Sequence, residues 1–189
     1  MNKNTLKIDD LVFPIKNAEL LCKIFNKKAY WNINIDTFGK VIDGEEWVPR
    51  IYSEELYALS DIRSWKDLDG KKLEWDNCYI EDEGDYNASI YVFEHNEIYN
   101  SSIDIMHIAK QDFSVNWTAR CDVNFNAKYS TNLDLKINTQ CAFAGIMVVD
   151  DNISQSKALS LIKHYYPNDN YHLDNQQDRF VHPLFSPSE

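Results

Sequence analysis

The sequence predicts an α+β fold that is mainly β, an antiparallel meander sheet with one or two short helices packed on it. Apolar and polar residues alternate strictly in several segments, whereas helical periodicity is confined to short ones. The 189 residues are enough for one domain with a proper core, and no linker rich in Gly, Pro or Ser divides them. We therefore expect a single domain over residues 1–189, whose sheet is open, a sandwich or a partly closed barrel.

The clearest strand runs from residue 113 to 125, where seven apolar residues alternate with six polar ones. Alternation of period two gives a strand one buried and one solvated face, so Trp117 should lie in the core. The links "EHNE" and "AKQD" are typical of hairpin turns. Further strands are predicted at residues 31–35, 71–76, 87–94, 98–108 and 133–143, whereas the structure of residues 18–27 is left open.

Two segments have helical signals. Ser53 is a suitable cap for a short helix over residues 54–60, whose first turn is acidic. In "SQSKALSLIKHYY" the apolar residues recur at helical spacing until Pro167 ends the run. After it we expect an irregular tail, about 168–189, that packs through a few apolar anchors: Phe180, Val181, Leu184 and Phe185.

We expect a cytoplasmic protein with free thiols. Asp9 and Asp10 interrupt the apolar stretch that a signal peptide would need, and about 18 consecutive apolar residues, as in a membrane helix, occur nowhere. The four cysteines stand singly, without the close pairing of a zinc site or a redox dithiol. We expect buried thiols at Cys22, Cys78, Cys121 and Cys141.

The negative charge is concentrated in one segment. The chain has a net charge of −11, and residues 43–85 hold fourteen acidic against five basic residues. We therefore expect no nucleic-acid partner, because affinity for phosphates comes from clustered Lys and Arg. The acids are either an ordinary solvated surface or a surface that attracts a basic protein.

Aromatic residues in the same segment favour the second interpretation, since large rings anchor protein interfaces. Trp75 shares a strand face with Leu73 and should be core, whereas Trp65 stands in a charged loop without periodic support, so a partner-facing position is open to it. The predicted partner-binding residues are Glu45, Glu46, Trp65, Asp67, Asp69, Glu81, Asp82 and Glu83.

Motifs that carry catalytic mechanisms are missing. The sequence has no phosphate loop, dinucleotide fingerprint, nucleophile elbow or His-Glu-x-x-His pair, and its five histidines are isolated. Glu94 and His95 would point to opposite faces of a strand, so they do not form a joint site unless a turn begins there. We predict a non-enzymatic protein with no catalytic residues, no metal and no cofactor.

The order of "YWNINIDT", "EEWVPRIYSEEL", "IRSWKDLDGKKLEW" and "FSVNWTARCDV" within residues 29–149 resembles that of small bacterial immunity proteins. These proteins neutralise toxins of contact-dependent and other polymorphic toxin systems. The resemblance implies a cytoplasmic antitoxin that binds a cognate toxin domain, at its active site or away from it. A basic nuclease is the natural target for an acidic surface, and no functional residue is carried over by position.

Two other classes of function stay open. One is a small-ligand protein or enzyme with a pocket on the solvated face of the 113–125 strand, lined by Asn116, Thr118, Arg120 and Asp122. Arg120 beside Asp122 would then hold a carboxylate or phosphate, unless the two form a plain surface ion pair. The other is an assembly subunit that uses its sheet for self-association. The sequence leaves the oligomeric state undetermined.

Overall fold

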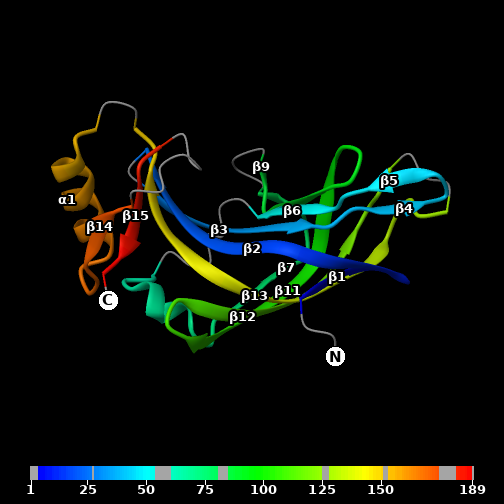
Figure 1. Ribbon diagram of the computed structural model, residues 1–189, viewed down its shortest axis with the longest axis horizontal. Coiled ribbons are helices and arrows are strands. Elements are labelled where there is room, and N and C mark those ends of the chain that lie inside the picture. The colour runs from blue at the N-terminus through cyan, green and yellow to red at the C-terminus, as the bar shows by residue number, and fades with distance from the viewer. Residues whose placement is uncertain are drawn as a thin grey trace.

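The computed structural model describes residues 4–26, 28–53, 61–80, 85–124, 128–150, 153–174 and 182–188. Strands dominate them, with one α-helix and one 3-10 helix (Figure 1). No helix in these ranges is long and apolar enough to cross a membrane. The elements are β1 (Thr5–Ile8), β2 (Leu11–Phe25), β3 (Lys28–Thr37), β4 (Lys40–Ile42), β5 (Glu45–Trp47), β6 (Arg50–Ser53), η2 (Trp65–Leu68), β7 (Lys72–Trp75), β8 (Tyr79–Ile80), β9 (Asp85–Tyr86), β10 (Ala88–Tyr91), β11 (His95–Ala109), β12 (Asp112–Cys121), β13 (Leu133–Val148), α1 (Gln155–Tyr165), β14 (Tyr171–Leu173) and β15 (Leu184–Pro187).

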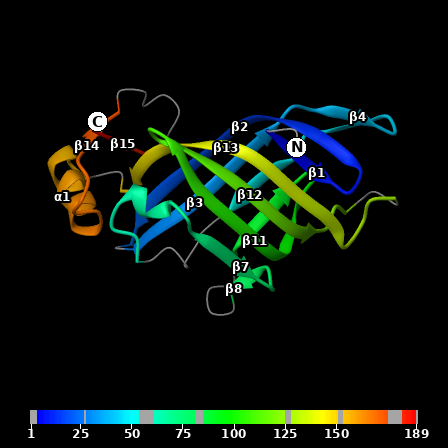
Figure 2. The same cartoon turned by 90° about the horizontal axis from the view of Figure 1, so that it is seen from below.

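Eight strands close into a barrel in the order β1-β2-β3-β6-β10-β11-β12-β13 (Figures 1 and 2). Strand β13 closes it, because its first half pairs antiparallel with β1 and its second half pairs parallel with β2. A register shift at Gly145 lets β13 bend there. Gly145 has φ +131°, and a Cβ at this position would lie 2.5 Å from the carbonyl oxygen of Phe185 on β15. Only glycine fits this approach.

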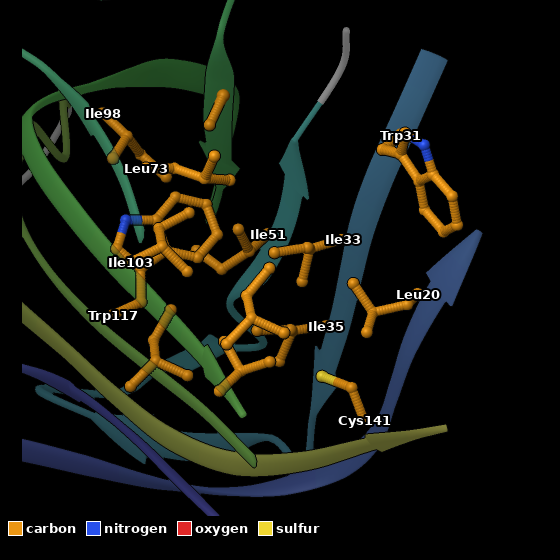
Figure 3. Packing of buried hydrophobic residues seen from close by; sticks show 14 of the residues in the cluster. Leu20, Trp31, Ile33, Ile35, Ile51, Leu73, Ile98, Ile103, Trp117 and Cys141 are labelled. Atoms are coloured by element: carbon orange, nitrogen blue, oxygen red, sulfur yellow. The ribbon is translucent and has the colours of Figure 1, made fainter. Parts of the chain in front are cut away.

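The inside of the barrel is a packed hydrophobic core. Inward side chains from facing strands meet there, among them Trp117, Ile103, Ile51 and Ile33, each with 0% exposure (Figure 3). Eight strands enclose a space that side chains are able to fill. The Trp117 indole N–H donates to the Ser101 hydroxyl at 2.7 Å, so even this polar group is satisfied inside.

The predicted fold class is confirmed, and the predicted strands are present with shifted ends. The main difference is the parallel pairing of β2 with β13, which a simple meander lacks. Residues 18–27, whose structure was left open, fall largely on the long strand β2. The turn expected at "EHNE" lies slightly earlier, at residues 92–94, because β11 already begins at His95. The helix predicted at 54–60 lies outside the described residues.

The C-terminal part forms more regular structure than expected. Helix α1 buries Ala158 and Ile162 at one end of the barrel, on the side where β14 and β15 lie (Figure 1). The tail is not irregular throughout, because β15 pairs with β13 through Phe185 and Ile146 and carries β14 on its other edge. Phe185 has 0% exposure and is a true anchor. Phe180 and Val181 lie outside the described residues.

Candidate functional site

The acidic residues predicted to bind a partner are divided between two ends of the molecule. Glu45 and Glu46 are exposed on β5, in the hairpin at the end opposite α1 (Figures 1 and 2). Asp67 belongs to η2, which is hydrogen-bonded to Asp169 just after α1. These positions therefore do not form one continuous acidic surface. The remaining predicted residues, Glu81, Asp82 and Glu83, lie outside the described residues.

Two of these carboxylates are used by the fold. The Asp67 Oδ2 atom accepts the backbone N–H of Ser64 at 2.9 Å, which completes a capping box at the start of η2. The Asp69 Oδ1 atom accepts the backbone N–H of His107 at 2.8 Å and ties the end of η2 to β11. Both groups satisfy backbone donors that would otherwise be unpaired. A local structural role accounts for them without a partner.

The partner-facing position considered for Trp65 is wrong, because this residue is only 8% exposed. Its ring stacks on Phe143 with the centroids 5.8 Å apart and an interplanar angle of 18°. The backbone N–H of Trp65 donates to the buried Asp169 carboxylate at 3.1 Å, which holds this residue in place. Trp75 is half-buried, with its ring edge on Trp117 at 5.9 Å.

The best candidate for a binding surface is the outer face of β6, β10 and β11. Cross-strand register places Tyr91 between Arg50 and His95, and Ser89 between Tyr52 and Glu97. These residues stand at alternate positions, so their side chains share the outer side of the wall. Asp36 beside Arg50, the Tyr79–Tyr86 ring pair, Asp76 and the Asp122 partner of Tyr99 extend this surface beyond the three strands. We call the whole surface the tyrosine face and define it by Asp36, Arg50, Tyr52, Asp76, Tyr79, Tyr86, Ser89, Tyr91, His95, Glu97, Tyr99 and Asp122.

One end of the tyrosine face is a hollow of about 310 Å³ lined by Arg50, Tyr52, Tyr91 and His95. The imidazole of His95 lies 5.2 Å from the ring of Tyr91 and 5.9 Å from that of Tyr52, measured between centroids. A hydrogen bond to the Tyr52 side chain is the main cause that raises the pKa of Arg50. A permanently charged guanidinium thus lies among aromatic rings, and Tyr91 is 36% exposed.

The other end is a hollow of about 520 Å³ between the 76–79 segment and β11. Tyr99 on its wall donates to the Asp122 carboxylate at 3.0 Å. Tyr79 is 48% exposed, and its ring packs on Tyr86 with the centroids 4.8 Å apart. The residues lining this hollow are Asp76, Asn77, Cys78, Tyr79, Glu97, Tyr99, Asn100 and Asp122.

Consecutive outward residues of one strand join the two hollows, because His95 lines the first and both Glu97 and Tyr99 line the second. Alternate residues of a strand are roughly 7 Å apart, so the hollows are neighbours. Across the whole tyrosine face the carboxylates outnumber the single guanidinium of Arg50. The surface therefore combines several tyrosine rings with a net negative charge.

Tyr79 and Tyr99 are neutral hydrogen-bonding groups at physiological pH. The hydrogen bond with Tyr86 is the main cause that raises the pKa of Tyr79 to about 12. Burial, followed by the hydrogen bond to Asp122, raises the pKa of Tyr99 to about 12. Neither phenol is prepared to act as a general base, which would need a pKa near the operating pH.

Burial also keeps the four cysteine thiols protonated at physiological pH. All four cysteines are free and buried, as predicted. Burial raises the pKa of Cys22, Cys121 and Cys141 to about 12 and that of Cys78 to about 11, so nucleophilic thiolates are rare. Within the described ranges, three or more His, Cys, Asp or Glu residues never gather as a metal site would require.

Glu94 and His95 have separate partners. Glu94 accepts a hydrogen bond from the Asn124 side chain at 2.8 Å, whereas the Nδ1 atom of His95 lies 3.2 Å from the Ser89 hydroxyl. The two side chains therefore do not form a joint acid and base pair, although Glu94 belongs to the turn and not to the strand on which the prediction had placed it.

The pocket considered on the solvated face of β12 differs from the predicted one. Arg120 does not pair with Asp122, because its Nη1 atom lies 2.6 Å from the Asp134 carboxylate on β13. Asp122 instead accepts from Tyr99 and from the backbone of Asn132. A hollow of about 210 Å³ does occur on this face, but it lies farther along β12, around Asn116 and Thr118.

The prediction from sequence missed most of the tyrosine face because it placed the binding surface within the acidic segment, residues 43–85. Tyr91 and Tyr99 stand at the solvated positions of their strands, next to the buried Ile90 and Ile98. A tyrosine at a position that alternation assigns to solvent is the signal that could have found them. No comparable pattern in the sequence marked Arg50, because its neighbours on β10 and β11 are determined only by strand pairing.

These features define a closed β-barrel with a filled interior and a candidate binding surface on its outside. Comparisons with models of protein families, with curated proteins and with solved structures gave no match for this chain.

Proposed function

We propose that this protein is a non-enzymatic binding protein of the immunity type, which acts in the cytoplasm and neutralises a basic toxin domain by docking it on the tyrosine face. The observation that carries the proposal is the cross-strand register that puts Tyr52, Tyr91 and Arg50 side by side beside carboxylates. Tyrosine and arginine are the residue types that most often dominate the binding energy of protein interfaces.

The negative charge of the tyrosine face indicates that the proposed partner is basic. Asp76, Glu97 and Asp122 line the larger hollow together with Tyr79 and Tyr99. Asp36 lies 3.7 Å from Arg50, and the whole chain carries a net charge of −11. Such a surface accelerates the approach of a basic protein and repels acidic competitors. A domain that cuts nucleic acid needs a basic surface to hold phosphates, which makes a nuclease toxin the fitting target.

The filled barrel interior supports an external binding site. Small eight-stranded barrels that carry ligands hold them inside, whereas here large side chains such as Trp117 and Trp31 occupy that space. Binding through the outer wall requires no opening of the core. Most of the tyrosines stand on strands of the barrel wall, and side chains that are already ordered lose little entropy on docking.

Affinity capture from the native cell lysate tests this proposal, with the tagged wild type compared with the Tyr52→Ala/Tyr91→Ala double variant. We expect the wild type to retain one basic protein at low salt and less of it at high salt, and the double variant to lose it. The matched control is Met106→Ala/Ile108→Ala, which removes two exposed side chains from the far part of β11. Equal retention by the wild type and the Tyr52→Ala/Tyr91→Ala variant would refute the assignment of the tyrosine face.

A further inference from the structure

We propose that the outer face of β1, β12 and β13 holds a small oxyanion, a phosphate or carboxylate group, between Lys7 and Lys136. This site lies on a different part of the wall from the tyrosine face and is independent of the proposed partner. The sequence analysis considered a pocket on the solvated face of β12 in which Arg120 would hold the anion. In this site Lys7 and Lys136 take that role.

Strand register builds the site. Lys7 on β1 stands opposite Lys136 on β13, which in turn stands opposite Thr118 on β12. The neighbouring row holds Asn138 opposite Asn116. All of these side chains line one hollow of about 210 Å³, which is large enough for an oxyanion with a small attached group.

Two lysines directly opposite each other are unfavourable for the sheet alone, because like charges at this spacing repel. Their neutralisation within the described residues is weak. Asp134 approaches the ammonium of Lys136 only to 3.6 Å, and its other oxygen is held by Arg120 at 2.6 Å. Lys136 thus shares one distant carboxylate with Arg120, and a lysine pair in this position over a hollow favours a bound anion.

The remaining polar groups of the hollow also suit an anion. Asn138 donates its side-chain N–H to the Asn116 oxygen at 2.7 Å, so the side-chain amide of Asn116, which lines the hollow, still has its own N–H donors. The Thr118 hydroxyl is an additional donor. Ammonium, amide and hydroxyl donors together complement the oxygens of phosphate or carboxylate, whereas they offer a metal cation little.

NMR titration of the ¹⁵N-labelled full chain with inorganic phosphate, at ionic strength held constant with sodium chloride, tests the site. We expect saturable shifts at Lys7, Asn116, Thr118 and Lys136, with binding roughly tenfold weaker in Lys7→Met and in Lys136→Met, a loss of about 1.4 kcal/mol. A parallel titration with acetate shows which oxyanion is preferred, and saturation by either supports the site. Lys157→Met on α1 is the matched control, since it removes one exposed lysine far from the hollow.

A second variant tests the hollow without removing a lysine. Asn116→Asp places a negative charge inside the hollow and should abolish the saturable shifts, while its thermal unfolding shows that the fold is kept. The proposal is overturned if neither anion gives saturation, or if the Lys7→Met, Lys136→Met and Lys157→Met variants respond alike. Neither result would affect the tyrosine face, which contains none of these residues.

Discussion

The buried carboxylate of Asp169 accepts a hydrogen bond from the Ser64 hydroxyl at 3.0 Å, across 105 residues of sequence. The same carboxylate accepts the backbone N–H of Trp65 at 3.1 Å and the hydroxyl of Tyr171 at 3.3 Å. Asp169 is 7% exposed, and these three donors replace the water that its charge has lost. It thereby fastens the C-terminal part of the chain to η2.

Removal of this carboxylate should destabilise the protein. Asp169→Ala leaves three donors without an acceptor, so we expect a loss of about 3 kcal/mol in the free energy of unfolding, measured by urea denaturation. Asp169→Asn keeps one acceptor oxygen and should lose about half as much. Asp112→Ala, which removes an exposed carboxylate, is the control and should stay within about 0.5 kcal/mol. Equal unfolding of Asp169→Ala and the control would contradict the role of Asp169.

Trp117 should be among the most costly residues to truncate. Its side chain has 0% exposure, and its indole N–H is paired with Ser101. Trp117→Ala should therefore reduce the free energy of unfolding by about 3–5 kcal/mol. Trp75→Ala, at a half-buried ring, should cost clearly less in the same urea experiment. A smaller loss for Trp117 than for Trp75 would mean that the core is not centred where Figure 3 shows it.

Local pattern accounts for what the sequence predicted correctly. The alternation around Trp117 depends on neighbours two residues away, so it revealed β12 and its buried face directly. The closure of the barrel depends instead on β13 pairing with β2, more than a hundred residues earlier, which no short period encodes. Residues 18–27 also concealed their strand, because Leu20, Leu21 and Cys22 are all buried and interrupt the alternation.

The candidate site shows the same division. The position of Trp65 depends on Phe143 and Asp169, both far away in sequence, and a four-residue 3-10 helix is too short to have a visible period. Charge counting along the chain placed Glu45 and Asp67 in one segment, although the fold puts them at different ends. The tyrosines at solvated strand positions were readable in principle, but their assembly into one surface required the order of β6, β10 and β11.

The buried thiols should make the protein less stable at alkaline pH. Burial raises the pKa of Cys141 from an ordinary value of 9.0 to about 12. Above pH 9 the unfolded thiol loses its proton while the folded one keeps it, so the native state binds more protons and stability falls with rising pH. This contribution is complete below pH 9 and is lost as the pH rises through 12. Urea denaturation at pH 8, 9.5 and 10.5 measures the decline.

Thiol labelling supplies the check on that decline. Iodoacetamide at pH 8 should leave the native protein unlabelled and label four cysteines in urea, since only unfolding exposes them. Rapid labelling of the native chain, or stability that is constant from pH 8 to 10.5, would show that these thiols are not held protonated by burial.

Charge reversal distinguishes the tyrosine face from the acidic hairpin as the docking surface. With the partner obtained by capture, Glu97→Lys/Asp76→Lys should slow association roughly tenfold at low salt and weaken its salt dependence, because steering depends on the sign of the surface charge. Glu45→Lys/Glu46→Lys makes the same change of charge on β5 and should leave the association rate nearly unaltered. Stopped-flow association at several salt concentrations measures both. A stronger effect of the β5 variant would move the docking surface to the hairpin, where the sequence alone had placed part of it.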